Sequence, residues 1–431
     1  MKKALIFIIA ATLILSLAAC AAPKAEAEPS PLPSEEMASP SPELTPPPVT
    51  PTPAPRTAEE VLPPIEKDIF EGRDDFVYAQ SFSAAGYSIS VILDDGRVLT
   101  RGDYMPSEPD ETGFAKETRY ADNYVYLNCE QFDTFAIDDN DVLWGRGAVS
   151  WWGNITGVKP GEPAPHRLLT DVQMASTSAG TYLALRKDGS VWMWGGGTYG
   201  QLGAGEAYTV YSQGPQCSLT EPVKVLEDCV FAEITGYCFA IKTDGSLWVW
   251  GYRGKDAETG DSVCYYRPVH IMDDVKYANG ILAVKTDGTL WALNSHWNDR
   301  ENEFYGNTYY PEKPVQIMED VKYAWGVNRF MVIKNDGSLW VWGDNTNGAL
   351  GDGTENYIAE PMKLMDNVVW ADAEMFGIYA LKANGELWGA GSLTVQFDPA
   401  SDTENPPTEA EIRQRRLPHK LLSGVRLTKT A

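Results

Sequence analysis

A short segment in which both faces of a strand are apolar recurs along the chain. Its clearest copy is Lys242–Gly251, where an Asp-Gly pair precedes the run Leu-Trp-Val-Trp-Gly. An Asp-Gly pair between two apolar runs is the strongest short-range signal for a β-hairpin, and we expect a type I′ turn with φ > 0 at both central residues. Because neither face of the strand is polar, the hairpin should be covered on both sides.

The segment occurs seven times, and its turn residue is always Asp or Asn: Asp95, Asn140, Asp188, Asp244, Asp287, Asp336 and Asn384. The fourth position after the turn residue holds Leu99, Trp144, Trp192, Trp248, Trp291, Trp340 and Trp388. The seventh position holds Gly102, Gly147, Gly195, Gly251, Asn294, Gly343 and Gly391, which predicts φ > 0 where the strand ends. Successive turns are 43 to 56 residues apart, a spacing typical of propeller blades.

Two further strands belong to each repeat. One ends in a small residue, and we place these residues nearest a narrow central axis: Ala79, Ala175, Ala232, Ala278, Ala324 and Ala371, with Leu127 in the second copy. The other is an apolar stretch opened by Pro, a residue tolerated at the start of a strand; examples begin at Pro222, Pro268, Pro314 and Pro361. Four strands in each of seven repeats predict an all-β, seven-bladed propeller with antiparallel blades.

The C-terminus supplies one more Pro-containing strand, Leu417–Leu422, followed by Gly424 and Val425. No good copy of this strand precedes the first repeat. We therefore predict that the C-terminal strand completes the first blade and closes the ring.

Charge limits the classes of partner. The formal net charge is −25, of which −22 lies on residues 66–431. This charge repels phosphate backbones, so we expect no nucleic-acid binding and no binding of the domain to anionic membranes. These 366 residues exceed the usual size of a single core, a difficulty that modular blades remove.

The N-terminus has the features of an export signal. A basic start, an apolar stretch from Ala4 to Leu17 and small residues before Cys20 resemble a bacterial lipoprotein signal over residues 1–20. Cys20 would then carry the lipid and anchor the protein to a membrane, outside the cytoplasm. The alternative is ordinary signal cleavage next to an incidental Cys.

Residues 21–65 contain 14 of the 29 prolines and almost no aromatic residues, so they are predicted to form a disordered linker. Fully extended, the linker would reach about 140 Å from the anchor. A ligand for a proline-recognition domain is the alternative to a stalk. Residues 66–431 are predicted to form the propeller.

The pattern Asp-Gly-x-Leu/Val-Trp-x-Trp-Gly resembles the regulator-of-chromosome-condensation repeat family. Gly200–Gly203 and Gly348–Gly353 match the loop that follows the strand in family repeats. The resemblance covers about residues 75–391 and implies a seven-bladed propeller used mainly for protein contacts. The nucleotide exchange activity of the founding member does not carry over, because an exported acidic lipoprotein has neither the compartment nor the basic surface for it.

Long connections between the Trp-containing strand and the Pro-led strand should emerge on one face of the ring. They are rich in aromatic residues, which gain contact area at low entropic cost. The candidate ligand-binding residues are Trp151, Trp152, Tyr199, Tyr208, Tyr211, Tyr252, Tyr266, Trp297, Tyr305 and Tyr309. Alternatively, single rings fold back as lids on the blades. The recurring tryptophans, Trp144 to Trp388, are instead expected in the core.

Motifs for catalysis or for a cofactor do not occur, and we predict neither an enzyme nor a metal site. Asp344 to Glu355 partly matches a calcium loop, but its Gly stands one position early. No spacing singles out a pair of carboxylates for glycoside hydrolysis.

Five cysteines remain after Cys20: Cys129, Cys217, Cys229, Cys238 and Cys264. The odd number leaves at least one unpaired. The pairs Cys229–Cys238 and Cys217–Cys264 are possible, and buried reduced thiols are at least as good an interpretation.

The sequence therefore predicts a lipid-anchored monomer that binds a protein or a glycan at the cell envelope through its aromatic loops, without catalysis. The alternatives are an enzyme that acts on polysaccharide or cell wall through acidic residues of the same face, and a purely architectural surface protein.

Overall fold

The computed structural model describes residues 62–71, 81–85, 88–102, 114–116, 123–129, 133–147, 166–178, 180–197, 199–205, 218–235, 237–255, 262–293, 314–326, 329–374, 376–394 and 409–427. All of them belong to one compact unit, Pro55–Ala431. The predicted signal, Cys20 and most of the linker lie outside the described residues.

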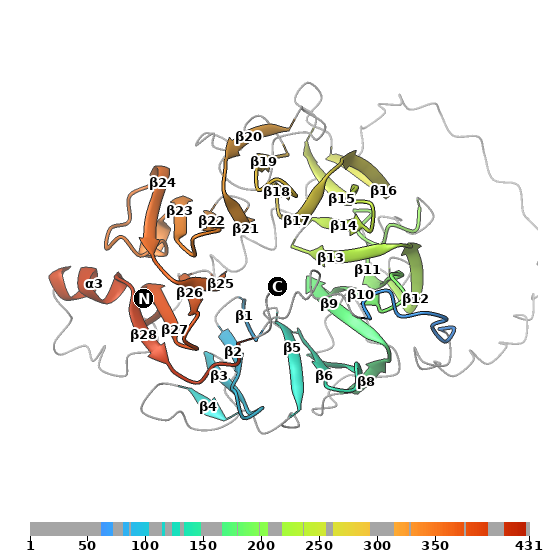
Figure 1. The fold of residues 1–431 in the computed structure, drawn as a ribbon, viewed down its shortest axis with the longest axis horizontal. Coiled ribbons are helices and arrows are strands. Elements are labelled where there is room, and N and C mark those ends of the chain that lie inside the picture. Colours follow the sequence, from blue (N-terminus) through green and yellow to red (C-terminus); the bar gives the residue numbers. More distant parts are fainter. Residues whose placement is uncertain are drawn as a thin grey trace, which may run out of the picture. The chain divides into compact units, whose positions relative to one another are not determined.

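Seven four-stranded antiparallel sheets are arranged as blades around an axis (Figure 1), which confirms the predicted propeller. The first three blades contain β1 (Phe82–Ala85), β2 (Ser88–Ile92), β3 (Val98–Gly102) and β4 (Ala115–Lys116); β5 (Tyr124–Cys129), β6 (Asp133–Asp138), β7 (Leu143–Gly147) and β8 (His166–Leu169); and β9 (Val172–Ser178), β10 (Thr181–Arg186), β11 (Val191–Gly196) and β12 (Ser218–Leu226). The fourth and fifth contain β13 (Cys229–Ile234), β14 (Cys238–Lys242), β15 (Leu247–Lys255) and β16 (Ser262–Met272); and β17 (Val275–Asn279), β18 (Leu282–Lys285), β19 (Leu290–Ala292) and β20 (Val315–Met318). The last two contain β21 (Val321–Gly326), β22 (Arg329–Lys334), β23 (Leu339–Gly343) and β24 (Ile358–Met365); and β25 (Val368–Glu374), β26 (Gly377–Lys382), β27 (Leu387–Gly391) and β28 (His419–Leu422).

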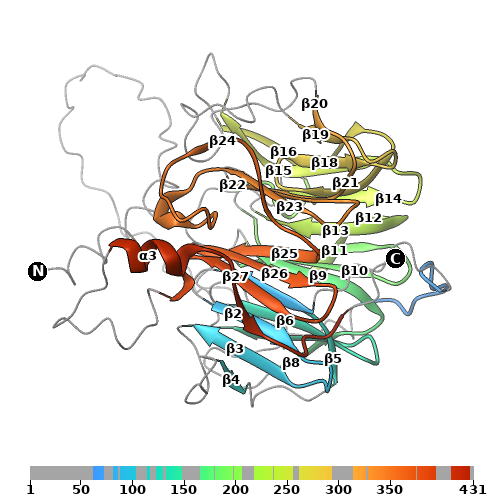
Figure 2. The same cartoon turned by 60° about the vertical axis from the view of Figure 1, so that its left-hand side comes forward.

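The first strand of each blade lies at the axis and the fourth at the rim (Figure 1). First strands of neighbouring blades pack against one another, and β1 packs against β25, so the ring is closed. One short helix, α3 (Glu409–Arg416), contacts β27 (Figure 2). Within the described residues, no helix combines the length and the apolar character needed to cross a membrane.

The predicted small residues lie in the first strands, next to the axis, and are almost fully buried, as Ala175 and Ala324 show. Each stands opposite a second-strand residue, which stands opposite the recurring Trp; one example is Ala232, Ala240 and Trp248. In the first blade the same register contains Phe82, Val91 and Leu99, so Phe82 occupies the position that we assigned to Ala79. Ala79 itself lies outside the described residues.

The Asp-Gly turns differ from the predicted type I′ turn. Gly245 has φ of 82°, but Asp244 is not among the described residues with positive φ. The Gly245 N–H donates to the Lys242 carbonyl at 2.9 Å, which closes a four-residue turn ending in a left-handed Gly. This is the geometry of a type I turn followed by a bulge. In the second copy Asp141 takes the place of Gly, with φ of 60°.

The predicted positive φ at the end of the Trp-containing strand is confirmed at four positions, Gly195, Gly251, Gly343 and Gly391. A Cβ atom on Gly195 would lie 2.3 Å from the Gly180 carbonyl oxygen. Glycine is therefore required there both for its backbone conformation and for close packing.

The predicted role of the C-terminal strand is wrong in one respect. Each Pro-led strand is the outermost strand of the blade that precedes it, so β28 completes the seventh blade rather than the first. Ring closure comes from the next residues, because Val425 forms a β-bridge with Leu93 of the first blade. The Gly424 carbonyl accepts the Asp94 N–H at 2.8 Å, and the Val425 N–H donates to the Gly385 carbonyl at 3.1 Å. Equivalent hydrogen bonds join the second blade to the third and each later blade to the next.

The recurring tryptophans are less buried than predicted. Only Trp192 is classed as buried, and the others of this column are half-buried. The fully buried rings are those of the second Trp in the pattern, Trp194, Trp250 and Trp342. The second Trp thus fills the space between blades, whereas the recurring Trp lies next to the Asp-Gly turn of its own hairpin.

The start of the described chain is fastened to the third blade. Arg186 donates to the Pro63 carbonyl at 2.7 Å, and the Ile69 N–H donates to the Lys187 carbonyl at 2.8 Å. Pro63 falls within the residues that we assigned to the linker, so contacts with the propeller begin before residue 66.

Candidate functional site

The ring has two distinct faces. The Asp-Gly turns and the connections between blades lie on one of them, which we call the turn face. The long connections between third and fourth strands, such as the one from Gly196 to Ser218, lie on the other, which we call the loop face. The common direction of equivalent strands places these connections together, as the sequence pattern predicts.

Three of the ten candidate aromatic residues are described, and all three lie at the boundary between the third and fourth blades. The rings of Tyr199 and Tyr252 meet edge to face, with centroids 5.8 Å apart. Tyr266 packs over Gly200. All three tyrosines are half-buried, so each ring both packs on a blade and presents surface to solvent. Trp151, Trp152, Tyr208, Tyr211, Trp297, Tyr305 and Tyr309 lie outside the described residues.

The loop that begins at Gly197 clamps the third blade to the fourth. The Gln201 carbonyl accepts the Trp250 indole N–H at 2.7 Å, and the Gly205 N–H donates to the Tyr266 carbonyl at 2.9 Å. Leu202 is fully buried beneath it. A Cβ atom on Gly203 would lie 3.0 Å from the Trp250 ring, so the loop needs glycine where it crosses the indole.

The segment from Asp344 to Glu355 forms the equivalent clamp after the sixth blade. Its oxygen atoms bind the protein itself: Asp344 accepts the Thr346 hydroxyl at 2.6 Å, and Asp352 accepts the Thr354 N–H at 2.7 Å. Glu355 forms an ion pair with Arg416. Among the described residues no group of His, Cys, Asp and Glu side chains has the arrangement of a metal site.

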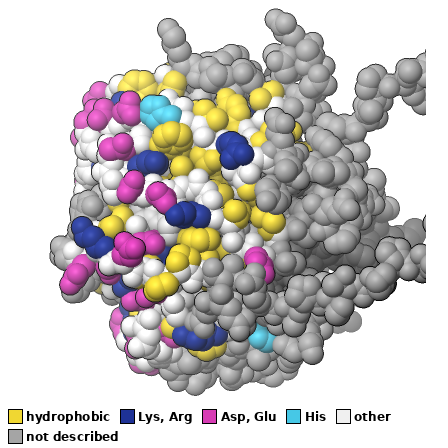
Figure 3. Space-filling model, turned by 90° about the vertical axis from the view of Figure 1, so that its right-hand side faces the viewer, with side chains coloured by type: hydrophobic (Ala, Val, Ile, Leu, Met, Phe, Trp, Pro, Cys, Tyr) yellow, Lys and Arg dark blue, Asp and Glu magenta, His cyan; other side chains and the backbone are white. Residues whose placement is uncertain are grey.

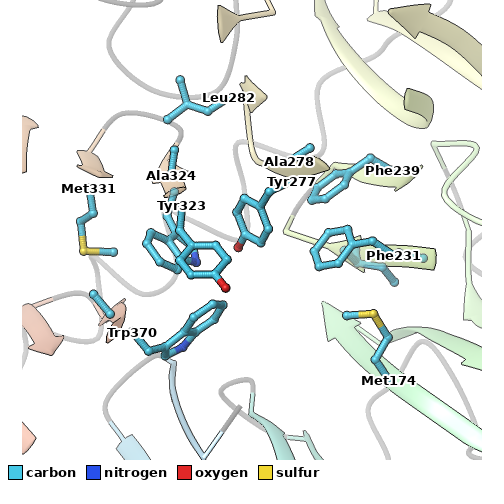
Figure 4. Packing of buried hydrophobic residues seen from close by; sticks show 14 of the residues in the cluster. Met174, Phe231, Phe239, Tyr277, Ala278, Leu282, Tyr323, Ala324, Met331 and Trp370 are labelled. Carbon is cyan, nitrogen blue, oxygen red and sulfur yellow. The ribbon is translucent and has the colours of Figure 1, made fainter. Parts of the chain in front are cut away.

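Aromatic rings from successive first strands lie side by side next to the axis (Figure 4). The centroids of Phe231 and Tyr277 are 5.2 Å apart, those of Tyr277 and Tyr323 are 5.3 Å apart, and those of Tyr323 and Trp370 are 5.4 Å apart. These residues immediately precede the small-residue column. They pack the first strands of neighbouring blades against one another with apolar surface, which stabilises the ring.

Polar side chains follow the small-residue column by one position. In six blades they are Ser83, Asn128, Ser176, Glu233, Asn279 and Asp372, whereas the sixth blade has Trp325. Four of them accept a backbone N–H from the next blade. Ser83 accepts from Cys129 at 3.0 Å, Asn128 from Thr177 at 3.0 Å, Ser176 from Ile234 at 3.1 Å, and Asp372 from Ala84 at 2.9 Å.

Two carboxyl groups in this polar ring have strongly raised pKa values. Burial raises the pKa of Glu233 to about 8, against the opposing effect of the Asn279 amide, which donates to Glu233 at 3.1 Å. Burial also raises the pKa of Asp372 to about 7, although it accepts the Ala84 and Ala373 N–H groups. Raised pKa values occur at catalytic acids and in structural networks alike. Here the hydrogen bonds to neighbouring blades assign a structural role to Asp372.

The sequence analysis missed this polar ring, although a signal for it exists. A polar residue follows the small-residue column in six of seven copies, at a position where a strand buried on both faces is otherwise apolar. Polar residues at a fixed register in such strands indicate shared hydrogen-bond partners, because a buried polar group without one is costly.

The structure excludes the Cys229–Cys238 disulfide, and both thiols are free. Cys229 stands opposite Lys242 and Cys238 opposite Ile234, at opposite ends of one strand pair, beyond the reach of a disulfide. Burial raises the pKa of each thiol to about 12, so both stay protonated near neutral pH. Cys217 lies outside the described residues, and the Cys217–Cys264 pair stays a prediction.

Models of the regulator of chromosome condensation (RCC1) repeat match residues 188–230 and 336–372, and a second model of this repeat matches residues 172–201. The chain is similar to human E3 ubiquitin-protein ligase HERC2, with 29% identity over 184 residues, which cover 40% of this chain and 4% of HERC2. It is also similar to the mitochondrial RCC1 domain-containing protein RUG3 of Arabidopsis thaliana. That match has 36% identity over 141 residues and covers 31% of this chain and 30% of RUG3. The matched part is therefore less than a third of either relative.

Solved structures with the same fold include Prp20p from Saccharomyces cerevisiae and human WBSCR16. The superposition on Prp20p has a TM-score of 0.56 with 17% identity and covers 75% of this chain and 88% of Prp20p. The superposition on WBSCR16 has a TM-score of 0.52 with 16% identity and covers 69% of this chain and 84% of the other. At this level of identity the likeness concerns the fold.

Proposed function

Since this chain is an RCC1-repeat seven-bladed propeller, we propose that it is a non-catalytic binding module held at the cell envelope by a lipid on Cys20. Its loop face engages a protein or a glycan through aromatic side chains. The partner is not recognised through phosphate groups, because the domain carries a net charge of −22 and repels them.

The observation that carries the proposal is the gathering of aromatic residues on one face. Tyr199, Tyr252 and Tyr266 come from three separate segments, and the clamp between two blades brings them to one boundary. Half-buried rings held by neighbouring backbone are preorganised for contact, since little side-chain entropy is lost on binding. The remaining candidates lie outside the described residues; in the sequence they fall between the third and fourth strands of the second, third and fifth blades.

The central carboxyl groups support a role without catalysis. Asp372 accepts two backbone N–H groups, and Glu233 accepts the Asn279 amide. These hydrogen bonds give both carboxyl groups a structural role in holding the first strands together. Prp20p, whose structure is described together with its binding properties to Gsp1p and histones, uses the same fold in a protein that binds other proteins.

The test is a pull-down with the full chain from the envelope of the producing cell, followed by affinity measurement on the captured component. The triple variant Trp151→Ala, Trp152→Ala, Trp297→Ala should lose at least about tenfold in affinity, as expected of aromatic hot spots. Its melting temperature should stay within about 2 °C of the wild type, because rings that contact only the partner add little folding stability and about 1 kcal/mol shifts the melting temperature of a domain of this size by only about 1 °C.

Trp248→Ala serves as the control, because this half-buried ring belongs to the blade rather than to a loop-face connection. It should bind like the wild type. A collapse of stability in the triple variant would identify the three rings as lids, and turnover of the captured component would establish an enzyme instead.

A further inference from the structure

A groove lies at the rim between the third and fourth blades, away from the central axis. Its volume is about 440 Å³, and it is lined by Val223, Lys224, Val225, Leu226, Arg267 and Pro268. The first four residues belong to β12 and the last two to β16, the outermost strands of adjacent blades. Figure 3 views the side on which Figure 1 draws these strands. It shows hydrophobic side chains in a band that also contains Lys and Arg.

The register of both outer strands is interrupted beside the groove. In β16 the pairing with β15 shifts between Tyr265 and Val269, and Arg267 lies within this irregularity. In β12 the pairing with β11 shifts between Leu219 and Val223. Such shifts bend an edge strand and turn side chains away from the sheet. The clamp residues Gly203 and Ala204 form the end of the groove.

Both charged side chains that line the groove are cationic, although the protein is strongly acidic. The formal net charge of the chain is −25, yet the groove itself is lined by one Arg, one Lys and no acidic residue. Arg267 is exposed, and no described acidic side chain forms an ion pair with it. Its guanidinium group lies across Gly205, where a Cβ atom would be 2.7 Å from Nη2. Lys224 pairs only with the exposed Glu227, an interaction that costs little to exchange.

We propose that the groove between β12 and β16 binds an extended peptide segment in which apolar and acidic side chains alternate. The apolar side chains would pack on Val223, Val225 and Pro268, and the carboxylates would pair with Arg267 and Lys224. Alternation suits an extended segment because successive side chains point to opposite sides.

The backbone of the rim favours an extended occupant. β12 and β16 are terminal in their sheets, and within the described part of the chain no further strand pairs with their outer edges. An edge strand presents N–H and C=O groups on its outer side, to which an added strand can hydrogen-bond, the mode of recognition known as β-augmentation. A cationic partner does not fit, because its charge is repelled by Arg267. A nucleic acid does not fit either, because its phosphates are repelled by the acidic surface outside the groove.

The proposal is tested by fluorescence anisotropy with the full chain and a labelled peptide of sequence Val-Glu-Val-Glu-Val, amidated at its C-terminus. Binding should weaken about tenfold in Arg267→Glu and should also weaken as salt is raised, because surface charge pairs are screened. The matched peptide Val-Gln-Val-Gln-Val should bind at least about tenfold more weakly than the Glu peptide.

Lys363→Glu is the matched control. Lys363 stands opposite Trp340 and pairs with Asp366, as Lys224 stands opposite Trp192 and pairs with Glu227, but it lies on another blade. Lys363→Glu should leave the affinity for the Glu peptide unchanged. The loop-face triple variant should also leave it unchanged, so that failure of the groove and failure of the proposed loop-face function can be told apart. Equal binding of both peptides, or of Arg267→Glu and wild type, would overturn the proposal. The proposal would also be overturned if the wild type self-associated without binding the peptide, and if Arg267→Glu abolished that self-association.

Discussion

At the scale of single residues, the pattern Asp-Gly-Ser-x-Trp forms one hydrogen-bonded chain. Asp244 accepts the Ser246 N–H at 2.9 Å and its hydroxyl at 2.6 Å, and the Ser246 oxygen accepts the Trp248 indole N–H at 2.9 Å. The Lys242 ammonium lies 5.1 Å from the Trp248 centroid. The Ser246 hydroxyl lowers the pKa of Asp244, because it stabilises the charged carboxylate. The same chain recurs at Thr289 and Ser338, which explains why a hydroxyl residue follows Asp-Gly.

The prediction at the residue scale concerns how the protonation of Glu233 affects the pH dependence of stability. The pKa of Glu233 is raised from 4.5 to about 8, so the folded state holds the proton more tightly than the unfolded state. The stability contributed by the protonated group is complete below about pH 4.5 and is lost as pH rises through about 8. Glu233→Gln keeps an acceptor for Asn279 without the ionisable proton. Its free energy of unfolding should exceed that of the wild type at pH 9 by about 5 kcal/mol, at about 1.4 kcal/mol per pKa unit, and should vary less with pH.

Denaturant unfolding at pH 5 and pH 9 measures this difference. Glu227→Gln removes an exposed acid of the same repeat and should preserve the wild-type pH dependence. If Glu233→Gln and the wild type lose equal stability between pH 5 and pH 9, the burial of this carboxyl is not what governs the pH dependence.

At the scale of elements, the third strand of a blade places two tryptophans in different surroundings. In β15, Trp250 is fully buried and donates to the Gln201 carbonyl of the preceding blade. Trp248 is half-buried and donates to Ser246 of its own hairpin. One Trp therefore joins two blades, and the other fastens a turn to its strand.

Alanine substitutions in β15 should separate these roles. Trp250→Ala creates a cavity between blades and should cost about 3–5 kcal/mol. Trp248→Ala loses a partly exposed ring and one hydrogen bond and should cost about 1–2 kcal/mol. Equilibrium unfolding of both variants provides the comparison. Equal losses would mean that the two rings share one core environment.

At the scale of the whole molecule, the ring is closed by residues far apart in sequence. Gly424 and Val425 form the same hydrogen bonds to the seventh and first blades that link other neighbouring blades. Arg426 adds a hydrogen bond from its N–H to the Ile92 carbonyl and one from its side chain to the Tyr124 carbonyl. Val425 is fully buried, so closure also adds apolar contact.

A chain that ends at Ser423 should therefore lose about 3 kcal/mol of stability, from a buried valine and several backbone hydrogen bonds. The loss should be concentrated in the first blade, where hydrogen exchange of the Asp94 amide should become fast. A chain that ends at Leu427 keeps every closing contact of the described residues and is the control. Unchanged exchange at Asp94 after the shorter truncation would show that other contacts hold the ring closed.

Several features followed from the sequence because they depend on local spacing. The number of blades, the small-residue column and the glycines at Gly195 and Gly391 come from repeated short-range patterns, and a strand or turn imposes its requirements on neighbours in sequence. The sequence did not show which of two neighbouring blades contains each Pro-led strand. A strand such as Pro268–Ile271 precedes one hairpin and follows another at similar distances. Only strand pairing assigns it to the earlier blade.

The sequence by itself determined a sevenfold repeat of one two-faced apolar hairpin, because that pattern has few stable solutions other than a closed ring of blades. The tertiary structure decided which side chains meet across blades. It joined Asp372 to Ala84, set Trp250 rather than Trp248 between sheets, and opened the groove beside Arg267. These contacts join residues distant in the chain, and the free energy of such a contact depends on packing that no local pattern encodes.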